Sequence, residues 1–206
     1  MYSKLDNNIE LCWGTPVSVF DITESSGINP KIEKYIKSRY EDFNLISSRD
    51  SVFNSLSDLD NWDIEESKVL KKIIIKNFLV FLKNIAIKFS SNTPIGLFCS
   101  FAGYGNNKIS LQVKKRKSAW TGIYLINCSL DDNLNNKNNI ISFLDPRHGS
   151  GTVSDGFEVF GNSREFNFKT GQLFFFPSWI NLGHKSNLYS ENNFYITIEI
   201  IFPDLV

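Results

Sequence analysis

The sequence predicts an α+β fold in which two helices come first and a series of short strands follows. Helical spacing of apolar residues is confined to the first 93 residues. Beyond Pro94, short extended runs alternate with Gly, Asn, Ser and Asp. Aromatic residues make up 14% of the chain, including 18 Phe, which favours β-rich packing around large rings. This order of elements predicts helices that cover one face of a β-sandwich or jelly roll.

The length of the chain, 206 residues, predicts a single domain with a full hydrophobic core. Within it, residues 1–93 would form an N-terminal strand and supporting helices, and residues 94–206 the β core. The formal net charge is zero and the pI is about 6.7, so no overall field attracts nucleic acid or an anionic membrane. We therefore expect neither as a partner.

The cysteines and the N-terminus both favour a cytoplasmic location. Cys12, Cys99 and Cys128 are far apart and form no C-x-x-C motif, which predicts free, buried thiols in a reducing compartment. The first residues lack the apolar core of a signal peptide. The most apolar stretch, Val69 to Phe89, is interrupted by lysines, which a membrane span would not tolerate.

The first helix is expected near residue 30. Val17–Phe20 reads as a short strand that starts after Pro16. Asn29 is then expected to cap a helix with Pro30 at its first position. The apolar residues that follow at helical spacing are Ile32, Tyr35, Ile36 and Tyr40.

The second helix is expected after a polar loop over Glu41–Asp63. Asp63 with Glu66 three residues on has the composition of a capping box. The helix should run to about Phe89, and its apolar residues cover much of its circumference, so we expect broad packing against a sheet.

Six short runs after Pro94 are expected to be strands because turn-forming residues separate them. They are Leu97–Ala102, Lys108–Val113, Ala119–Ile126, Asn139–Leu144, Gly156–Phe160 and Glu165–Phe168.

The last part of the chain adds further β-segments around a histidine. A turn at Gly171 precedes an apolar run with no polar face, which predicts a strand buried on both sides and ended by Pro177. Phe194–Ile201 predicts another strand, with Tyr195, Thr197 and Glu199 on one face and apolar residues on the other.

Several motifs in order along the chain resemble one protein family, the bacterial and phage 2-oxoglutarate/Fe(II) oxygenases of prolyl-hydroxylase-like type. The matching pieces are Gly14–Val17 with Ile28, Asn29 and Ile32; Ser55–Leu59 with Trp62; Trp120–Leu125; Phe143–Arg147; and Gly171–Trp179. The resemblance implies a double-stranded β-helix of jelly-roll or cupin-like type with an N-terminal helical layer. It also implies Fe(II) held by two histidines and a carboxylate, with three positions open for 2-oxoglutarate and oxygen.

The resemblance also implies a set of site residues. The chain has only two histidines, so a two-histidine iron site must use both His148 and His184, with Asp145 or Asp155 as the carboxylate. The implied cofactor-binding residues are Tyr124, Arg147 and Tyr195, and no catalytic residue is assigned. The expected reaction is a hydroxylase-type oxidation of a small molecule or a peptide side chain.

Three departures from the family pattern support an alternative function. The slots expected for the first ligand motif align with Val113 and Lys115, and a protonated lysine repels a metal ion. His184 follows Trp179 by five residues, whereas the family spacing is three. Phe194-Tyr195 stands where a basic residue would hold 2-oxoglutarate. The alternative is a catalytically degenerate member that acts as a non-metal binding or assembly module, and a homodimer remains open in either case.

Overall fold

The computed structural model describes residues 4–6, 9–12, 14–44, 59–87, 95–103, 118–128, 139–145, 163–182 and 194–202. The helices are α1 (Ser25–Asn44) and α2 (Glu65–Asn84), with a 3-10 turn η1 (Leu59–Asn61) before α2. The strands are β1 (Lys4–Asp6), β2 (Ile9–Cys12), β3 (Thr15–Asp21), β4 (Gly96–Gly103), β5 (Trp120–Asn127), β6 (Ile140–Leu144), β7 (Ser163–Asn167), β8 (Gln172–Pro177) and β9 (Phe194–Ile201).

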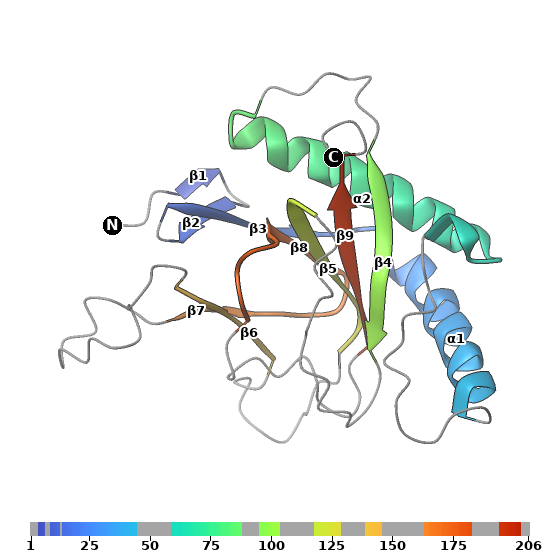
Figure 1. Ribbon diagram of the computed structural model, residues 1–206. Helices are drawn as coiled ribbons and strands as arrows, with labels where there is room; N and C mark the ends of the chain where they lie inside the picture. The colour runs from blue at the N-terminus through green and yellow to red at the C-terminus, as the bar shows by residue number, and fades with distance from the viewer. Residues whose placement is uncertain are drawn as a thin grey trace.

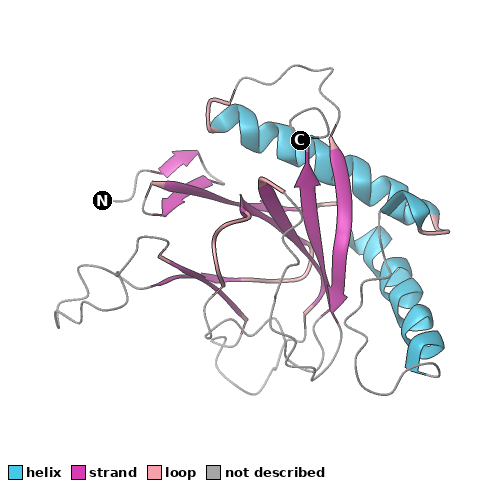
Figure 2. Cartoon of the chain, in the orientation of Figure 1, coloured by secondary structure: helices cyan, strands magenta, loops and turns pink. Residues whose placement is uncertain are grey.

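Two antiparallel sheets and two helices make up the fold (Figure 1). The large sheet has seven strands in the order β1-β2-β3-β8-β5-β9-β4, and the small sheet pairs β6 with β7. The helices pack on one face of the large sheet, and the small sheet lies on the other side (Figure 2). The predicted α+β class is therefore confirmed.

Strand alternation divides the core into two clusters, one on each face of the large sheet. On β9, Ile196, Ile198 and Ile200 face the helices, whereas Tyr195 belongs to the cluster on the opposite face. This division is the one that the sequence pattern of Phe194–Ile201 predicted. We call the face that carries Tyr195, Thr197 and Glu199 the inner face.

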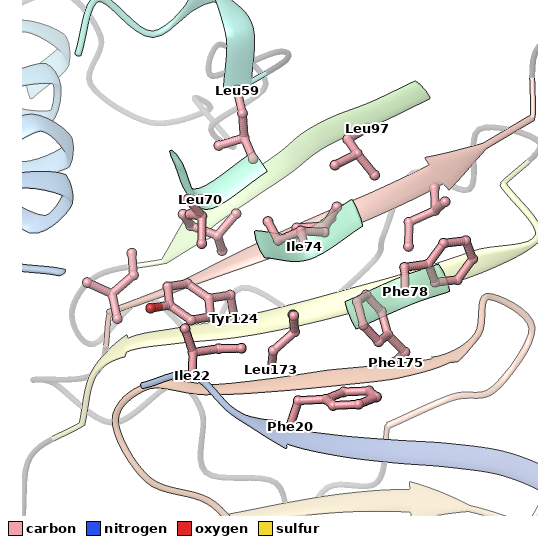
Figure 3. Close-up of a cluster of buried hydrophobic side chains, with 14 of the residues drawn as sticks. Phe20, Ile22, Leu59, Leu70, Ile74, Phe78, Leu97, Tyr124, Leu173 and Phe175 are labelled. Carbon is pink, nitrogen blue, oxygen red and sulfur yellow. The ribbon is translucent and has the colours of Figure 1, made fainter. Parts of the chain in front are cut away.

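The helix-side cluster is centred on Phe78, a fully buried residue of α2. Its ring centroid lies 5.3 Å from that of Phe175 and 6.2 Å from that of Trp120, and Figure 3 shows Phe78 above the sheet. Gly122 of β5 makes this packing possible, because a Cβ there would come within 3.2 Å of the Phe175 ring.

The inner cluster joins the large sheet to the small one through aromatic contacts. The Phe143 ring on β6 lies 4.9 Å from Phe176 of β8 and 5.7 Å from Phe166 of β7. An isolated antiparallel β-bridge also joins Phe143 of β6 to Leu182, which follows β8 in the sequence. The chain that follows β8 is thus held against the small sheet.

The start of α1 differs from the prediction. The helix begins at Ser25, so Pro30 lies inside it and Asn29 is no cap. Asn29 is instead 95% buried, and its side chain is used for tertiary hydrogen bonds to β5. The helix also continues to Asn44, into the segment expected to be a loop.

The ends of α2 differ as well. Ile64, with extended backbone angles, precedes the first turn, and Asp63 is exposed without capping the helix. The helix ends at Asn84, earlier than the predicted Phe89, because Ala86 adopts a left-handed conformation with φ 60°. The amide of Ile87 donates to the Leu82 carbonyl and that of Ala86 to the Lys83 carbonyl, the pattern of a Schellman motif.

The described strands from β3 onward agree with the predictions to within one or two residues, whereas β1 and β2 were not predicted. The segment after Pro177, expected to be extended, begins with a turn and has a single bridge at Leu182. Two predicted strands, Lys108–Val113 and Gly156–Phe160, lie outside the described residues. Among the described helices, none is both long and apolar enough to cross a membrane.

Candidate functional site

Buried polar side chains gather at one end of the inner face. Thr121 of β5 is paired in register with Glu199 of β9, and Ile123 is paired with Thr197. All three polar residues are at most 1% exposed. Alternation along two neighbouring strands therefore places two hydroxyl groups and a carboxylate on the same face of the sheet.

A chain of hydroxyl groups borders these residues where β8 ends. Pro177 pairs with Trp120 at the last position of β8, and the turn that follows is closed by the Ile180 amide donating to the Pro177 carbonyl. The Ser178 hydroxyl then lies 2.9 Å from the Thr121 hydroxyl and 3.1 Å from that of Ser118. The Phe-Pro-Ser-Trp motif thus ties β8 to β5.

Asp145 supplies a second buried carboxylate, at the end of β6. It is 8% exposed and directly follows β6, two residues after Phe143. Within the described part of the chain, Asp145 and Glu199 are the buried charged residues, and both are acidic. Buried ionisable groups are common at functional sites, so both are candidates for a functional role.

The two tyrosines predicted to bind the cofactor lie on opposite faces of the large sheet. Tyr195 is 2% exposed and belongs to the inner cluster, whereas Tyr124 is fully buried on the helix side. The Tyr124 hydroxyl donates to Asn29 Oδ1 at 2.5 Å, and Asn29 Nδ2 donates to the Ile126 carbonyl at 2.6 Å. Burial raises the pKa of Tyr124 well above its ordinary value, so the hydroxyl stays protonated as a donor.

The structure does not bring Tyr124 and Tyr195 together. A single small molecule on the inner face would meet Tyr195, while Tyr124 would remain on the far side of the sheet. The roles of both in cofactor binding stay predictions.

Of the three predicted metal ligands, one belongs to the described residues. Asp145 is described, whereas His148 and His184 lie outside the described residues, as does Arg147, which was predicted to bind the cofactor. In the residues that the structure does describe, no group of three or more His, Cys, Asp or Glu side chains could hold a metal ion. Leu182, two residues before His184, is bridged to Phe143, and β6 ends four residues before His148. The described segments that precede the two histidines in the sequence therefore lie side by side.

Sequence reasoning did not identify two of these residues as candidates. Glu199 had a visible signal, because it is the one charged residue in the apolar run Phe194–Ile201. Ser178 had none, because its hydrogen bonds to Thr121 and Ser118 join residues that are about 60 positions apart.

No protein-family model matches the chain, and no curated protein matches it. The resemblance to the oxygenases is therefore a prediction that depends on the motifs in the sequence and on the geometry of the inner face.

Proposed function

We propose that this chain is a double-stranded β-helix protein of the 2-oxoglutarate/Fe(II) oxygenase type, acting on a small molecule or a peptide side chain. The strand order carries the proposal. In such a winding, the chain passes back and forth between two facing sheets, so strands distant in sequence become neighbours. The order β8-β5-β9-β4 places β5 between β8 and β9, with β6 and β7 set apart in a second sheet, and this arrangement supports the proposal.

The proposed ligands are His148, His184 and Asp145. Imidazole nitrogen and carboxylate oxygen suit Fe(II), and such a set leaves positions open on one side of the ion. Iron with 2-oxoglutarate bound would supply the oxidant for a C–H bond. The chain itself contributes the buried Asp145 carboxylate and the Phe143 and Phe176 rings, which keep water from the inner face.

The 2-oxoglutarate part of the proposal depends on Arg147. A dicarboxylate needs a basic partner, and the described inner face offers Tyr195, Thr197 and Glu199 on β9. An ionised Glu199 would repel a carboxylate bound beside it.

A second candidate function, a non-metal binding or assembly module, is favoured by the same observation. A buried carboxylate on the last strand, where the family would hold an oxoacid, suits a neutral or cationic ligand better than 2-oxoglutarate. The Phe-Pro-Ser-Trp motif would then have a structural role only, in which the Ser178 hydroxyl forms hydrogen bonds with Ser118 and Thr121.

Anaerobic metal binding and 2-oxoglutarate turnover separate the two functions. We expect the purified chain to bind Fe(II) or Mn(II) anaerobically by calorimetry. With Fe(II), O2 and ascorbate as reductant, it should convert 2-oxoglutarate to succinate and CO2. His184→Ala and His148→Ala should each remove both properties. Asn181→Ala, an exposed position before His184, is the matched control and should retain them. A chain that binds no metal after anaerobic reconstitution would leave the binding module as the function.

A further inference from the structure

The helix α2 concentrates positive charge in a chain that is neutral as a whole. Residues 67–87 contain five lysines and no Asp or Glu, although the chain has 22 basic and 22 acidic residues. This charge segregation has no evident part in the proposed iron site, because α2 packs on the side of the sheet away from the inner face.

The side of α2 that faces away from the sheet also exposes apolar residues. Leu70, Ile74 and Phe78 point to the sheet (Figure 3), whereas Val69, Leu79 and Val80 are 42%, 40% and 42% exposed. Five large hydrophobic residues are exposed in the described part of the chain; these three lie on α2, and Ile87 follows just after it. We define the outer face of α2 as Val69, Lys72, Lys76, Leu79, Val80 and Lys83.

Within the part of the chain that the structure describes, no ion pair neutralises the lysines of the outer face. Among the described residues, Lys72 and Lys83 form no ion pair or hydrogen bond, and Lys76 acts on Glu24 only through space. The acidic residues of α2 lie at its first turn, where Glu65 pairs with Lys68 and Glu66 with Lys31. A partner that covers this face must therefore bring negative charge.

The spacing of the outer face matches a second helix. Val69, Lys72, Lys76, Val80 and Lys83 follow one another at intervals of three or four residues, the spacing that a neighbouring helix meets along its seam. A second copy of the chain, packed by two-fold symmetry, would set this positively charged face against the same positively charged face. A lipid surface requires a continuous apolar stripe, which Lys72, Lys76 and Lys83 interrupt.

We propose that the outer face of α2 docks an acidic amphipathic helix of a partner protein. The apolar residues of that helix would cover Val69, Leu79 and Val80, and its carboxylates would meet Lys72, Lys76 and Lys83. This docking surface is independent of any metal or oxoacid on the inner face.

Binding of designed peptides tests the proposal directly. The probe is a fluorescein-labelled 21-residue helix with Leu along one stripe and Glu beside it, and the control is a peptide of equal composition in scrambled order. Fluorescence anisotropy should show binding of the first peptide to the full chain, at least tenfold tighter than the second. Raising the salt concentration should weaken it, since the contacts are charged.

Two variants locate the site on α2. Val69→Ser with Val80→Ser should weaken binding at least tenfold. Lys72→Glu with Lys76→Glu and Lys83→Glu should abolish it and permit binding of a peptide in which Lys replaces Glu. All of these positions are exposed, so circular dichroism should show an unchanged fold. Lys34→Glu, at an exposed lysine of α1, is the matched control and should bind as the unaltered chain does.

Three results would overturn the proposal. Equal binding of the scrambled peptide would show that the outer face attracts any negatively charged peptide and does not recognise an amphipathic helix. Cosedimentation with vesicles of 70% phosphatidylcholine and 30% phosphatidylglycerol, without peptide binding, would assign it to a membrane. Self-association that the Val69→Ser, Val80→Ser pair disrupts would assign it to a second copy of the chain.

Discussion

The two faces of the large sheet are built from the same strands, yet they are covered differently. On the helix side, β5 and β9 contribute Tyr124, Ile196 and Ile198 to a core closed by two long helices. On the inner side, the same strands contribute Thr121, Thr197 and Glu199, and a two-stranded sheet lies across from them. Alternation thus separates a face suited to stability from one that retains buried polar groups, where chemistry or binding would occur.

The largest expected effect lies in the helix-side core. Phe78→Ala should destabilise the fold by about 3–5 kcal/mol, because the fully buried ring leaves a cavity among Phe81, Trp120 and Phe175. Chemical denaturation monitored by circular dichroism would measure this. Leu79→Ala, at the adjacent exposed position, is the matched control and should cost less than about 1 kcal/mol. Equal losses at the two positions would show that α2 is not packed as described.

The hydrogen bonds between α1 and β5 should have the next largest effect. Tyr124→Phe removes the donor to Asn29 Oδ1 and should cost about 1–2 kcal/mol, because a buried acceptor is left unsatisfied. In a double-mutant cycle with Asn29→Ala, denaturation should show that the double variant loses less unfolding free energy than the sum of the losses in the two single variants. Strictly additive losses would indicate that the two residues act separately.

The inner face should be less sensitive to a single hydroxyl. Thr121→Val breaks the contact with Ser178 and should cost about 1 kcal/mol in the same measurement. Ser18→Ala is the matched control on the opposite face, because the buried Ser18 hydroxyl has no hydrogen bond among the described residues. It should be neutral or slightly stabilising. A larger loss of unfolding free energy for Ser18→Ala than for Thr121→Val would contradict the expected contribution of the Thr121–Ser178 contact.

The smallest effect concerns the pH dependence of stability at Cys128 in the inner cluster. Burial raises the pKa of this thiol to about 12, whereas an unfolded thiol titrates near 9. The unfolded state therefore loses its proton first, and stability falls as the pH rises above 9. Between pH 8 and 9.5 the loss due to Cys128 should be about 0.8 kcal/mol.

Denaturation of the unaltered chain and of Cys128→Ala at the two pH values would isolate this contribution. The other groups that titrate in the range cancel when the two pH dependences are subtracted. Identical pH dependences would show that the thiol is solvated in the native state.

Local sequence patterns determined much of the fold. The alternation in Phe194–Ile201 predicted the strand and its two faces, and the turn at Gly171 with Pro177 predicted the limits of β8. These signals are reliable because they arise from a period of two residues and from backbone restrictions of single residues. The two-helix, many-strand order likewise predicted the α+β class.

Tertiary contacts decided the helix ends and the composition of the inner face. Asn29 next to Pro30 has the form of a cap, yet its amide gains more from Tyr124 and Ile126, which lie about 95 residues away. Ala86 ends α2 in a conformation that sequence patterns assign to glycine. Thr121, Ser178 and Glu199 became neighbours only through strand pairing. A sequence specifies backbone preferences over a few residues, whereas which buried polar groups meet depends on register between distant strands.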